Sequence, residues 1–291
     1  MRHDATEVTT VSAYGSRTAV HAYGPEDGPG VLAVHGFRGT HFGLEPLAVG
    51  LASHGYRVHV PDLPGAGRST PLEGVHDAAG YGRWLVELTQ QMPRQRMLLG
   101  HSFGTVIVGS AIARGAEHDA AVLVNPILQP PMNGPRKLAT AAARAYYALA
   151  SLLPEDLAHR LLASRLVAGV AGSLMTSTRE PALRKWIREE HLREAGSFAS
   201  RNVVLESFAA SSVETLAGFV DAMASPTLIL GADADPLSPA EACTQEGSGL
   251  RSGTFHVFPN RGHLLPYEET RELTRLIAGW DLDVVGHPLS M

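Results

Sequence analysis

Short apolar runs alternate with helix-like repeats along most of this 291-residue chain, and this alternation restricts the fold more than any other feature. Between the runs, apolar residues recur at the three- and four-residue spacing of an amphipathic helix. Strands that alternate with helices form βαβ units, so the pattern predicts an α/β protein with a largely parallel sheet. We expect its strands at 31–35, 57–61, 96–99, 120–124, 226–230 and 254–258.

The segments around these strands predict the rest of the core. Residues 6–13 and 17–23 alternate in polarity around a turn at Gly15, as an antiparallel hairpin at a sheet edge does. Helical spacing and a glycine cap at Gly55 predict helices between the strands. We expect these helices at 44–54, 81–92 and 105–114, from about 239, and at about 268–280.

The alternation stops between about residue 130 and about residue 223. This stretch is rich in Ala, Leu and Arg, keeps a helical period and contains no convincing strand. Because strands follow it, the stretch predicts a helical cap inserted into the sheet domain; the alternative is a second helical domain without a catalytic role. The expected organisation is a first core part at 1–128, a helical cap at 129–222 and a second core part at 223–291.

The charge balance and the cysteine count exclude several classes of protein. With 24 Lys and Arg against 29 Asp and Glu, the net charge of -5 offers no basic face to a nucleic acid. The single cysteine, Cys243, allows neither an intramolecular disulfide nor a zinc site built from cysteines, and we expect an inert thiol. The first residues lack a signal-peptide pattern and no run of 18 apolar residues occurs, so we expect a cytoplasmic protein without a membrane span.

The sequence Gly-His-Ser-Phe-Gly at 100–104 fits the pattern G-x-S-x-G. A predicted strand leads into it and a predicted helix leads out of it, which is the context of a nucleophile elbow. In such a turn the flanking glycines let the backbone pass while the serine hydroxyl stands above the end of the sheet. Ser102 is therefore the candidate nucleophile. The alternative is a glycine-rich turn that holds a serine without a special role.

A serine hydroxyl becomes a strong nucleophile only if a nearby base takes its proton. Among 14 histidines, His263 stands out because it follows the last predicted strand, at the sheet end where Ser102 also lies. An acid must orient this imidazole, and the loop after strand 226–230 offers Asp233 and Asp235. We favour Asp235, because it lies deeper in the loop and precedes a proline, whereas Asp233 is close enough to the strand to bind backbone amides.

Amide donors must also face the oxyanion of a tetrahedral intermediate. The segment His-Gly-Phe-Arg-Gly at 35–39 ends the first buried parallel strand, where such donors are expected. The amide of Phe37 can then converge with the amide of Phe103, the residue after the candidate nucleophile. The alternative is an ordinary glycine turn with a core phenylalanine.

Together these motifs resemble those of the α/β-hydrolase superfamily, in particular its capped serine esterases and lipases. The resemblance implies an eight-stranded, mostly parallel sheet flanked by helices, with a helical cap inserted after the sixth strand. The chain order of the candidate serine, aspartate and histidine is also the order in this superfamily. The matching segments are HGFRG at 35–39, PDLPGAGRS at 61–69, GHSFG at 100–104, GADADPLSP at 231–239 and RGHLLPYE at 261–268.

The resemblance also implies a role for each candidate residue. A serine at the nucleophile position argues against a dehalogenase or an epoxide hydrolase. Two departures, Ala66 in place of a common histidine and Thr105 in place of a common glycine, remove no catalytic part. The implied roles are nucleophile for Ser102, base for His263, partner of the base for Asp235, and oxyanion-hole amides for Phe37 and Phe103.

Four further residues are candidates for substrate binding. Arg38 and His41 follow the predicted oxyanion loop and could recognise a carboxylate or an acyl carbonyl, although a solvated arginine and a packed histidine are the ordinary alternatives. Leu128 and Leu264 would line an apolar pocket, unless they belong to the core. No carboxylate neighbours His41 or His35 at a ligand spacing, so we expect no metal, and we expect no organic cofactor.

The sequence thus predicts a serine hydrolase that cleaves a carboxylic ester or related acyl bond of a small to medium, partly apolar substrate through an acyl-enzyme. A thioesterase, an acyltransferase or a C–C bond hydrolase would use the same triad. A cofactor-free lyase, cyclase or oxygenase, or a ligand-binding protein, would use the same fold without a reactive serine. The pattern leaves the oligomeric state open between monomer and homodimer.

Overall fold

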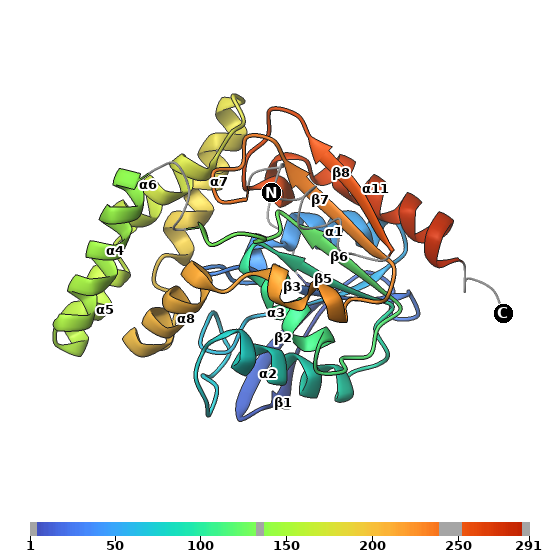
Figure 1. Cartoon of the computed structure of the whole chain (residues 1–291), viewed down its shortest axis with the longest axis horizontal. Helices are drawn as coiled ribbons and strands as arrows, with labels where there is room; N and C mark the ends of the chain where they lie inside the picture. Colours follow the sequence, from blue (N-terminus) through green and yellow to red (C-terminus); the bar gives the residue numbers. More distant parts are fainter. Residues whose placement is uncertain (1–4, 132–136, 239–251, 287–291) are drawn as a thin grey trace.

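The computed structural model describes residues 5–131, 137–238 and 252–286, and its strands form one eight-stranded sheet (Figure 1). The strands are β1 Glu7–Ala13, β2 Ser16–Tyr23, β3 Gly30–Val34, β4 Arg57–Pro61, β5 Met97–His101, β6 Ala120–Val124, β7 Thr227–Ala232 and β8 Gly253–Phe258. Their order across the sheet is β1-β2-β4-β3-β5-β6-β7-β8. β2 runs antiparallel to β1 and β4, whereas all other neighbours are parallel.

Helices cover both faces of this sheet, because successive side chains of each strand point to opposite faces. The core helices are α1 Glu45–Ser53, α2 Ala78–Gln90, α3 Phe103–Ile112, α10 Leu265–Glu268 and α11 Thr270–Trp280, with the short turns η1 His41–Gly43 and η4 Asp281–Val285. On β3, Leu32 and Val34 belong to the apolar core shared with α2 and α3. Val31 and Ala33 belong to the core shared with α1 and α11. Strands buried on both faces are typical of parallel sheets in α/β proteins.

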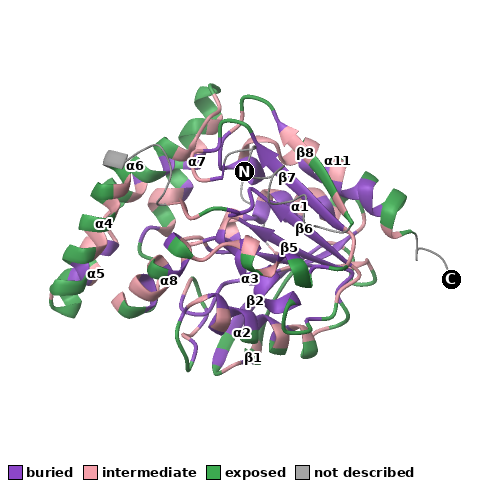
Figure 2. Ribbon diagram, viewed as in Figure 1, coloured by how far each residue is buried: buried purple, intermediate pink, exposed green. Residues whose placement is uncertain are grey.

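Between β6 and β7 the chain leaves the sheet and forms a group of helices beside it (Figure 1). These helices are α4 Lys137–Leu152, α5 Glu155–Leu162, α6 Arg165–Met175, α7 Pro181–Glu194 and α8 Arg201–Val213, followed by η3 Leu216–Ala222. We refer to residues 137–222 as the helical segment. It has a small core of its own around Ala150, Leu162 and Val204, and its outer surface is largely exposed (Figure 2).

No single helix of the described ranges is long and apolar enough to cross a membrane, and α8 and η3 meet that length and composition only as a pair bent by 70°.

The structure confirms the predicted α/β architecture with a mostly parallel sheet of eight strands. The helices that match predicted ones differ from the prediction by one to three residues at their ends. α2 begins three residues early, because the Asp77 side chain caps it by accepting a hydrogen bond from the Gly80 amide at 2.7 Å. The expected last helix corresponds to α11 and begins two residues later than predicted, because Glu269 has the non-helical angles φ -131° and ψ 29° and separates it from α10. The helix expected from about 239, and Cys243, lie outside the described residues.

Candidate active site

Ser102 lies at the sharp turn between β5 and α3, in a backbone conformation that few side chains adopt. Its φ is 56° and its ψ is -126°. The turn is possible because neighbouring backbone passes very close: a Cβ on Gly104 would lie 2.2 Å from the Val34 carbonyl oxygen, and one on Gly100 would lie 2.6 Å from the Gly104 oxygen. Both positions therefore require glycine. The result is a half-buried serine hydroxyl at the carboxyl end of the sheet.

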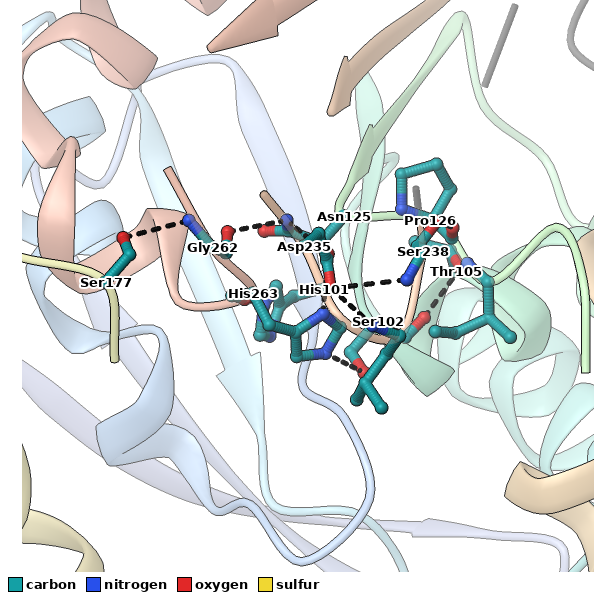
Figure 3. A network of polar contacts seen from close by, with 12 residues as sticks. His101, Ser102, Thr105, Asn125, Pro126, Ser177, Asp235, Ser238, Gly262 and His263 are labelled. Atoms are coloured by element: carbon teal, nitrogen blue, oxygen red, sulfur yellow. Dashed lines mark hydrogen bonds and ion pairs between the residues drawn. The ribbon is translucent and has the colours of Figure 1, made fainter. Parts of the chain in front are cut away.

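Three side chains from three loops meet at this turn in a continuous hydrogen-bonded chain (Figure 3). The His263 Nε2 lies 2.7 Å from the Ser102 Oγ, and the His263 Nδ1 lies 2.8 Å from the Asp235 Oδ2. A carboxylate can only accept, so Nδ1 carries the proton and Nε2 is left to accept the serine proton. This arrangement can deliver a proton from the serine to the imidazole.

The structure brings Asp235, and not Asp233, to the histidine. Asp235 is buried, and its second oxygen accepts the amides of Leu237 at 2.8 Å and Ser238 at 3.2 Å. Burial alone would raise the pKa of Asp235, but the adjoining His263 and these hydrogen bonds outweigh it and hold the pKa below its usual range. Asp233 is exposed and accepts the Asn260 amide at 2.7 Å, which is a loop contact.

Two residues to which the sequence analysis gave no role, Asn125 and His101, form hydrogen bonds to Asp235 and to the loop that carries His263. The Asn125 amide group donates to the Asp235 Oδ2 at 2.8 Å and to the Gly262 carbonyl at 3.2 Å. The His101 Nε2 donates to the His263 carbonyl at 3.0 Å. Burial and the adjoining His263 lower the pKa of His101 to about 3, so its ring is neutral at pH 7. His101 ends β5 and Asn125 follows β6. This position at the carboxyl end of a parallel strand is the sequence signal that could have identified them.

The two predicted oxyanion amides, of Phe37 and Phe103, belong to residues close to Ser102. The amide of Phe103 belongs to the first residue of α3, where backbone N–H groups lack partners within the helix. A Cβ on Gly36 would lie 2.9 Å from the Ser102 Cβ, which brings the Gly36–Phe37 peptide against the serine. Within the described ranges, neither amide donates a backbone hydrogen bond outside the regular helices and strands.

His35 fixes the orientation of that second peptide. Its Nε2 accepts the Leu63 amide at 2.9 Å, so its Nδ1 carries the proton and donates to the Gly36 carbonyl at 2.9 Å. Burial lowers the pKa of His35, which keeps the ring neutral. The C=O and N–H of a trans peptide point in opposite directions, so fixing the Gly36 carbonyl also fixes the Phe37 amide.

The four candidate substrate-binding residues occupy different places. Arg38 lines a cavity beside Phe37 and contacts the helical segment. His41 does not line that cavity; it is buried against Asp62, with its Nδ1 2.8 Å from the carboxylate. Leu128 and Leu264 are buried to 2% and 4% exposure and do not line the cavity either. Of the four, Arg38 alone borders the cavity next to the proposed oxyanion amides.

His21, His41 and Asp62 form a buried cluster whose atoms are close enough to suggest a metal site. The two imidazole rings stack at 3.4 Å with an interplanar angle of only 8°. The nitrogen lone pairs of stacked rings lie in parallel planes and do not converge on one ion. Both Asp62 oxygens also accept backbone amides, from His41 at 2.8 Å and Arg68 at 2.9 Å. We therefore assign this cluster to loop structure and not to a metal.

Replacing Asp62 by asparagine is expected to lower the free energy of unfolding by about 3 kcal/mol at pH 7, because a buried charge network loses its central anion. Burial opposes the Asp62 charge, yet His21 and His41 hold the pKa of Asp62 far below its usual range. The pKa of Asp62 is lower in the folded protein than in the unfolded chain, where it is about 4. The ionised carboxylate therefore stabilises the fold above about pH 4, and this stabilisation is lost progressively as the pH falls from about 4 towards the folded-state pKa. Urea unfolding between pH 7 and pH 3 measures both effects.

The exposed Asp27, replaced by asparagine, is the matched control for Asp62. We expect this control to unfold like the unmodified protein at every pH. A loss below 0.5 kcal/mol for Asp62→Asn at pH 7 would contradict a structural role of the cluster.

The helical segment contacts the His263 loop through Ser177. The Ser177 Oγ accepts the buried Gly262 amide at 2.9 Å, directly before His263 (Figure 3). The Glu268 carboxylate in turn accepts the Ser177 hydroxyl, the Ser177 amide at 2.7 Å and the Thr178 amide at 3.0 Å. The helical segment thus holds the backbone that carries the imidazole. Nothing in the local sequence around Ser177 indicates this contact.

Replacing Ser177 by alanine is expected to lower kcat about fivefold and leave KM nearly unchanged, because one hydrogen bond of about 1 kcal/mol no longer holds the Gly262 amide. Ser177→Thr, which keeps the hydroxyl, should restore kcat. Steady-state kinetics on a p-nitrophenyl ester measures both. An equal loss in Ser173→Ala, at an exposed serine whose hydroxyl donates to the Gly169 carbonyl within α6, would show that the effect is unspecific.

Comparison with known proteins agrees with this fold. The sequence profile of the Alpha/beta hydrolase family matches residues 31–276. The AB hydrolase superfamily protein YisY from Bacillus subtilis is 27% identical over 261 residues, which cover 85% of this chain and 90% of that protein. Among solved structures, the esterase EaEST from Exiguobacterium antarcticum has a TM-score of 0.75 and 20% identity, with 94% of this chain and 98% of that chain covered.

A second solved structure shows the range of activities on this architecture. The bromoperoxidase from Bacillus anthracis has a TM-score of 0.78 and 18% identity, with 95% of this chain and 100% of that chain covered. At such identities the likeness concerns the fold. The sheet order and the elbow define an α/β-hydrolase fold. With the profile match over most of its length, the chain belongs to the alpha/beta hydrolase family and is a hydrolase, as its motifs predict.

Proposed function

We propose that this protein is a serine esterase that cleaves small carboxylic esters through an acyl-enzyme. The observation that carries the proposal is the hydrogen-bonded chain from Ser102 through His263 to Asp235, at a serine with a φ of 56°. A serine in a strained turn, an imidazole with the correct free nitrogen and a buried ionised carboxylate are what a serine nucleophile needs to be activated, in addition to the oxyanion amides. The names of several solved neighbours, such as the Exiguobacterium esterase, are consistent with this activity.

In the acylation step, the Ser102 Oγ attacks the ester carbonyl carbon and its proton moves to the His263 Nε2. The negative charge that develops on the carbonyl oxygen is stabilised by the amides of Phe37 and Phe103. Collapse of the tetrahedral intermediate breaks the bond to the alcohol oxygen, which takes the proton from His263 and leaves. Asp235 keeps the imidazole in its orientation and stabilises its charged form.

In the deacylation step, water attacks the acyl-enzyme and gives a proton to the same His263 Nε2. The second tetrahedral intermediate then releases the carboxylic acid, and the proton returns to the Ser102 Oγ. The neutral His101 beside His263 adds no positive charge next to the imidazolium. No cofactor or metal is needed for either step.

The helical segment serves as the cap of this site in our proposal. Arg38, in the proposed oxyanion loop, donates to the carbonyls of Leu162 and Ala195, and Ser177 binds beside His263. The segment therefore contacts both the proposed oxyanion loop and the loop that carries His263. Such a cap would exclude water from the acyl group and limit its size.

A panel of matched substrates tests the proposal. We expect the protein to hydrolyse p-nitrophenyl acetate and butyrate with release of the free acid, measured by chromatography of the products. The corresponding thioesters and a β-diketone, assayed in parallel, separate esterase activity from thioesterase activity and C–C bond hydrolysis. Turnover of the thioester or the diketone alone would overturn the ester assignment.

A further inference from the structure

Arg38 is held in one orientation beside the proposed oxyanion amide of Phe37. Its backbone has a φ of 61°, which is unusual for a residue with a side chain. Its Nη2 donates to the Leu162 carbonyl at 2.7 Å and to the Ala195 carbonyl at 2.8 Å. Its guanidinium carbon also lies 4.8 Å from the centre of the Phe198 ring. The guanidinium is therefore fixed before any substrate arrives.

The other terminal nitrogen of Arg38, Nη1, is buried and makes no hydrogen bond within the described part of the chain. A guanidinium has five N–H donors and is not deprotonated in proteins. Nη1 therefore keeps its N–H donors at every pH and requires acceptors for them. A buried donor without an acceptor is costly, and such groups in native structures call for a ligand, a water or a functional reason.

Arg38 lines a cavity of about 40 Å³ that shares residues with the proposed oxyanion hole. Phe37 and Phe103, whose amides we assign to that hole, line the same cavity, as do Phe198 and Val204 from the helical segment. Ser102 is not part of the lining, but its neighbour Phe103 is. The volume suits a short chain and is well below the roughly 300 Å³ of a pocket for a drug-sized ligand.

The charge around the cavity favours an uncharged ligand group. Glu194 from α7 lines the cavity together with Arg38. The Glu194 carboxylate accepts hydrogen bonds from the hydroxyls of Ser197 at 2.9 Å and Thr40 at 3.3 Å. The Arg38 charge attracts a carboxylate, but the Glu194 charge offsets this attraction in so small a space, whereas a ketone, amide or hydroxyl oxygen needs only an N–H donor.

We propose that Arg38 forms a subsite for an uncharged oxygen acceptor on the acyl group, so that the preferred substrates are short esters with an oxo, amide or hydroxyl function a few atoms from the ester carbonyl. This inference rests on the proposed esterase function. Nη1 donates to that oxygen, while Nη2 keeps its bonds to the helical segment. Arg38 thus determines specificity and does not take part in the proton transfers.

Three methyl esters of one skeleton test this subsite. Methyl 4-oxopentanoate carries a ketone oxygen, methyl 4-methylpentanoate carries a methyl group in its place, and methyl hydrogen succinate carries a second, charged oxygen. Titration of the released acid gives kcat/KM for each. We expect the oxo ester to exceed the methyl analogue about tenfold, since a hydrogen bond from a charged donor is made only to the oxygen. The succinate ester should fall below the oxo ester.

Substitutions at Arg38 assign the preference to this residue. Arg38→Gln should reduce the ratio of kcat/KM for the oxo ester to kcat/KM for the methyl analogue to about one. Arg38→Lys lacks the planar fork of the guanidinium and should give a ratio between that of Arg38→Gln and that of the unmodified protein. The exposed Arg188 on α7, replaced by glutamine, is the matched control and should keep the full ratio. Because both esters are measured on one preparation, a partly unfolded variant lowers both rates and leaves the ratio interpretable.

Two outcomes overturn the subsite. The first is an unmodified protein that hydrolyses all three esters equally well, and the second is a preference that survives in Arg38→Gln. A failure of the proposed esterase function is recognised separately, because no ester of the set would then be hydrolysed in a Ser102-dependent way.

Discussion

Replacing Ser102 by alanine is expected to lower kcat/KM for ester hydrolysis by about 10⁴-fold or more, because no other group can form the acyl-enzyme. The Ser102 Oγ is the atom that lies 2.7 Å from the His263 Nε2. Without it, His263 can activate only water, and the remaining rate comes from the oxyanion amides and from substrate binding. Steady-state kinetics with p-nitrophenyl butyrate measures the loss.

The Ser102→Ala variant is also expected to stay folded. The backbone bonds of the elbow remain, from the Ser102 amide to Val124 at 3.0 Å and from the Thr105 amide to Ser102 at 2.9 Å. Thermal unfolding should therefore match that of the unmodified protein. Ser151→Ala, at an exposed serine on α4, is the matched control and should keep full activity. Turnover within tenfold of the original in a folded Ser102→Ala variant would place the nucleophile elsewhere.

Replacing Asp235 by asparagine is expected to lower kcat about 10⁴-fold, because an amide cannot hold the proton of His263 on Nδ1 or stabilise the imidazolium. The Asp235 carboxylate accepts that Nδ1 proton at 2.8 Å, and its depressed pKa keeps it ionised at neutral pH. The asparagine can instead donate to Nδ1, which leaves Nε2 protonated and unable to accept from Ser102.

Asp233→Asn is the matched control for this prediction, since Asp233 lies in the same loop two residues earlier. Its side chain accepts only the Asn260 amide among the described contacts, at an exposed position. We expect kcat to change less than threefold. A larger loss in Asp233→Asn than in Asp235→Asn would exchange the roles of the two aspartates.

The centre of the sheet was predictable from the sequence because the strands β3, β5, β6 and β7 are buried on both faces. A strand such as Ala120–Val124 is apolar at every position and is followed or preceded by clear turn residues. The role of Ser102 was equally predictable, because the strained turn requires glycine at positions 100 and 104 and the sequence has Gly100 and Gly104 there. These features depend on local chemistry, which the sequence displays directly.

The supporting contacts were not predictable, because they join residues that are distant in the chain. Asn125 and Asp235 are 110 residues apart, and Ser177 and Gly262 are 85 apart. Such pairs depend on how the strands are ordered and where the helical segment lies. His41 was considered for substrate binding, yet it faces Asp62 because the loop after β4 folds back beside it. The missing partner of the Arg38 Nη1 was likewise not predictable, because the guanidinium is positioned by the distant carbonyls of Leu162 and Ala195.

The most direct test of the central claim is the intact mass of the protein after treatment with a fluorophosphonate, which reacts with an activated serine and needs no knowledge of the substrate. We predict a single adduct on the unmodified protein and none on Ser102→Ala. A folded protein that forms no adduct, or a Ser102→Ala variant that still forms one, would contradict the assignment of Ser102 as the activated nucleophile.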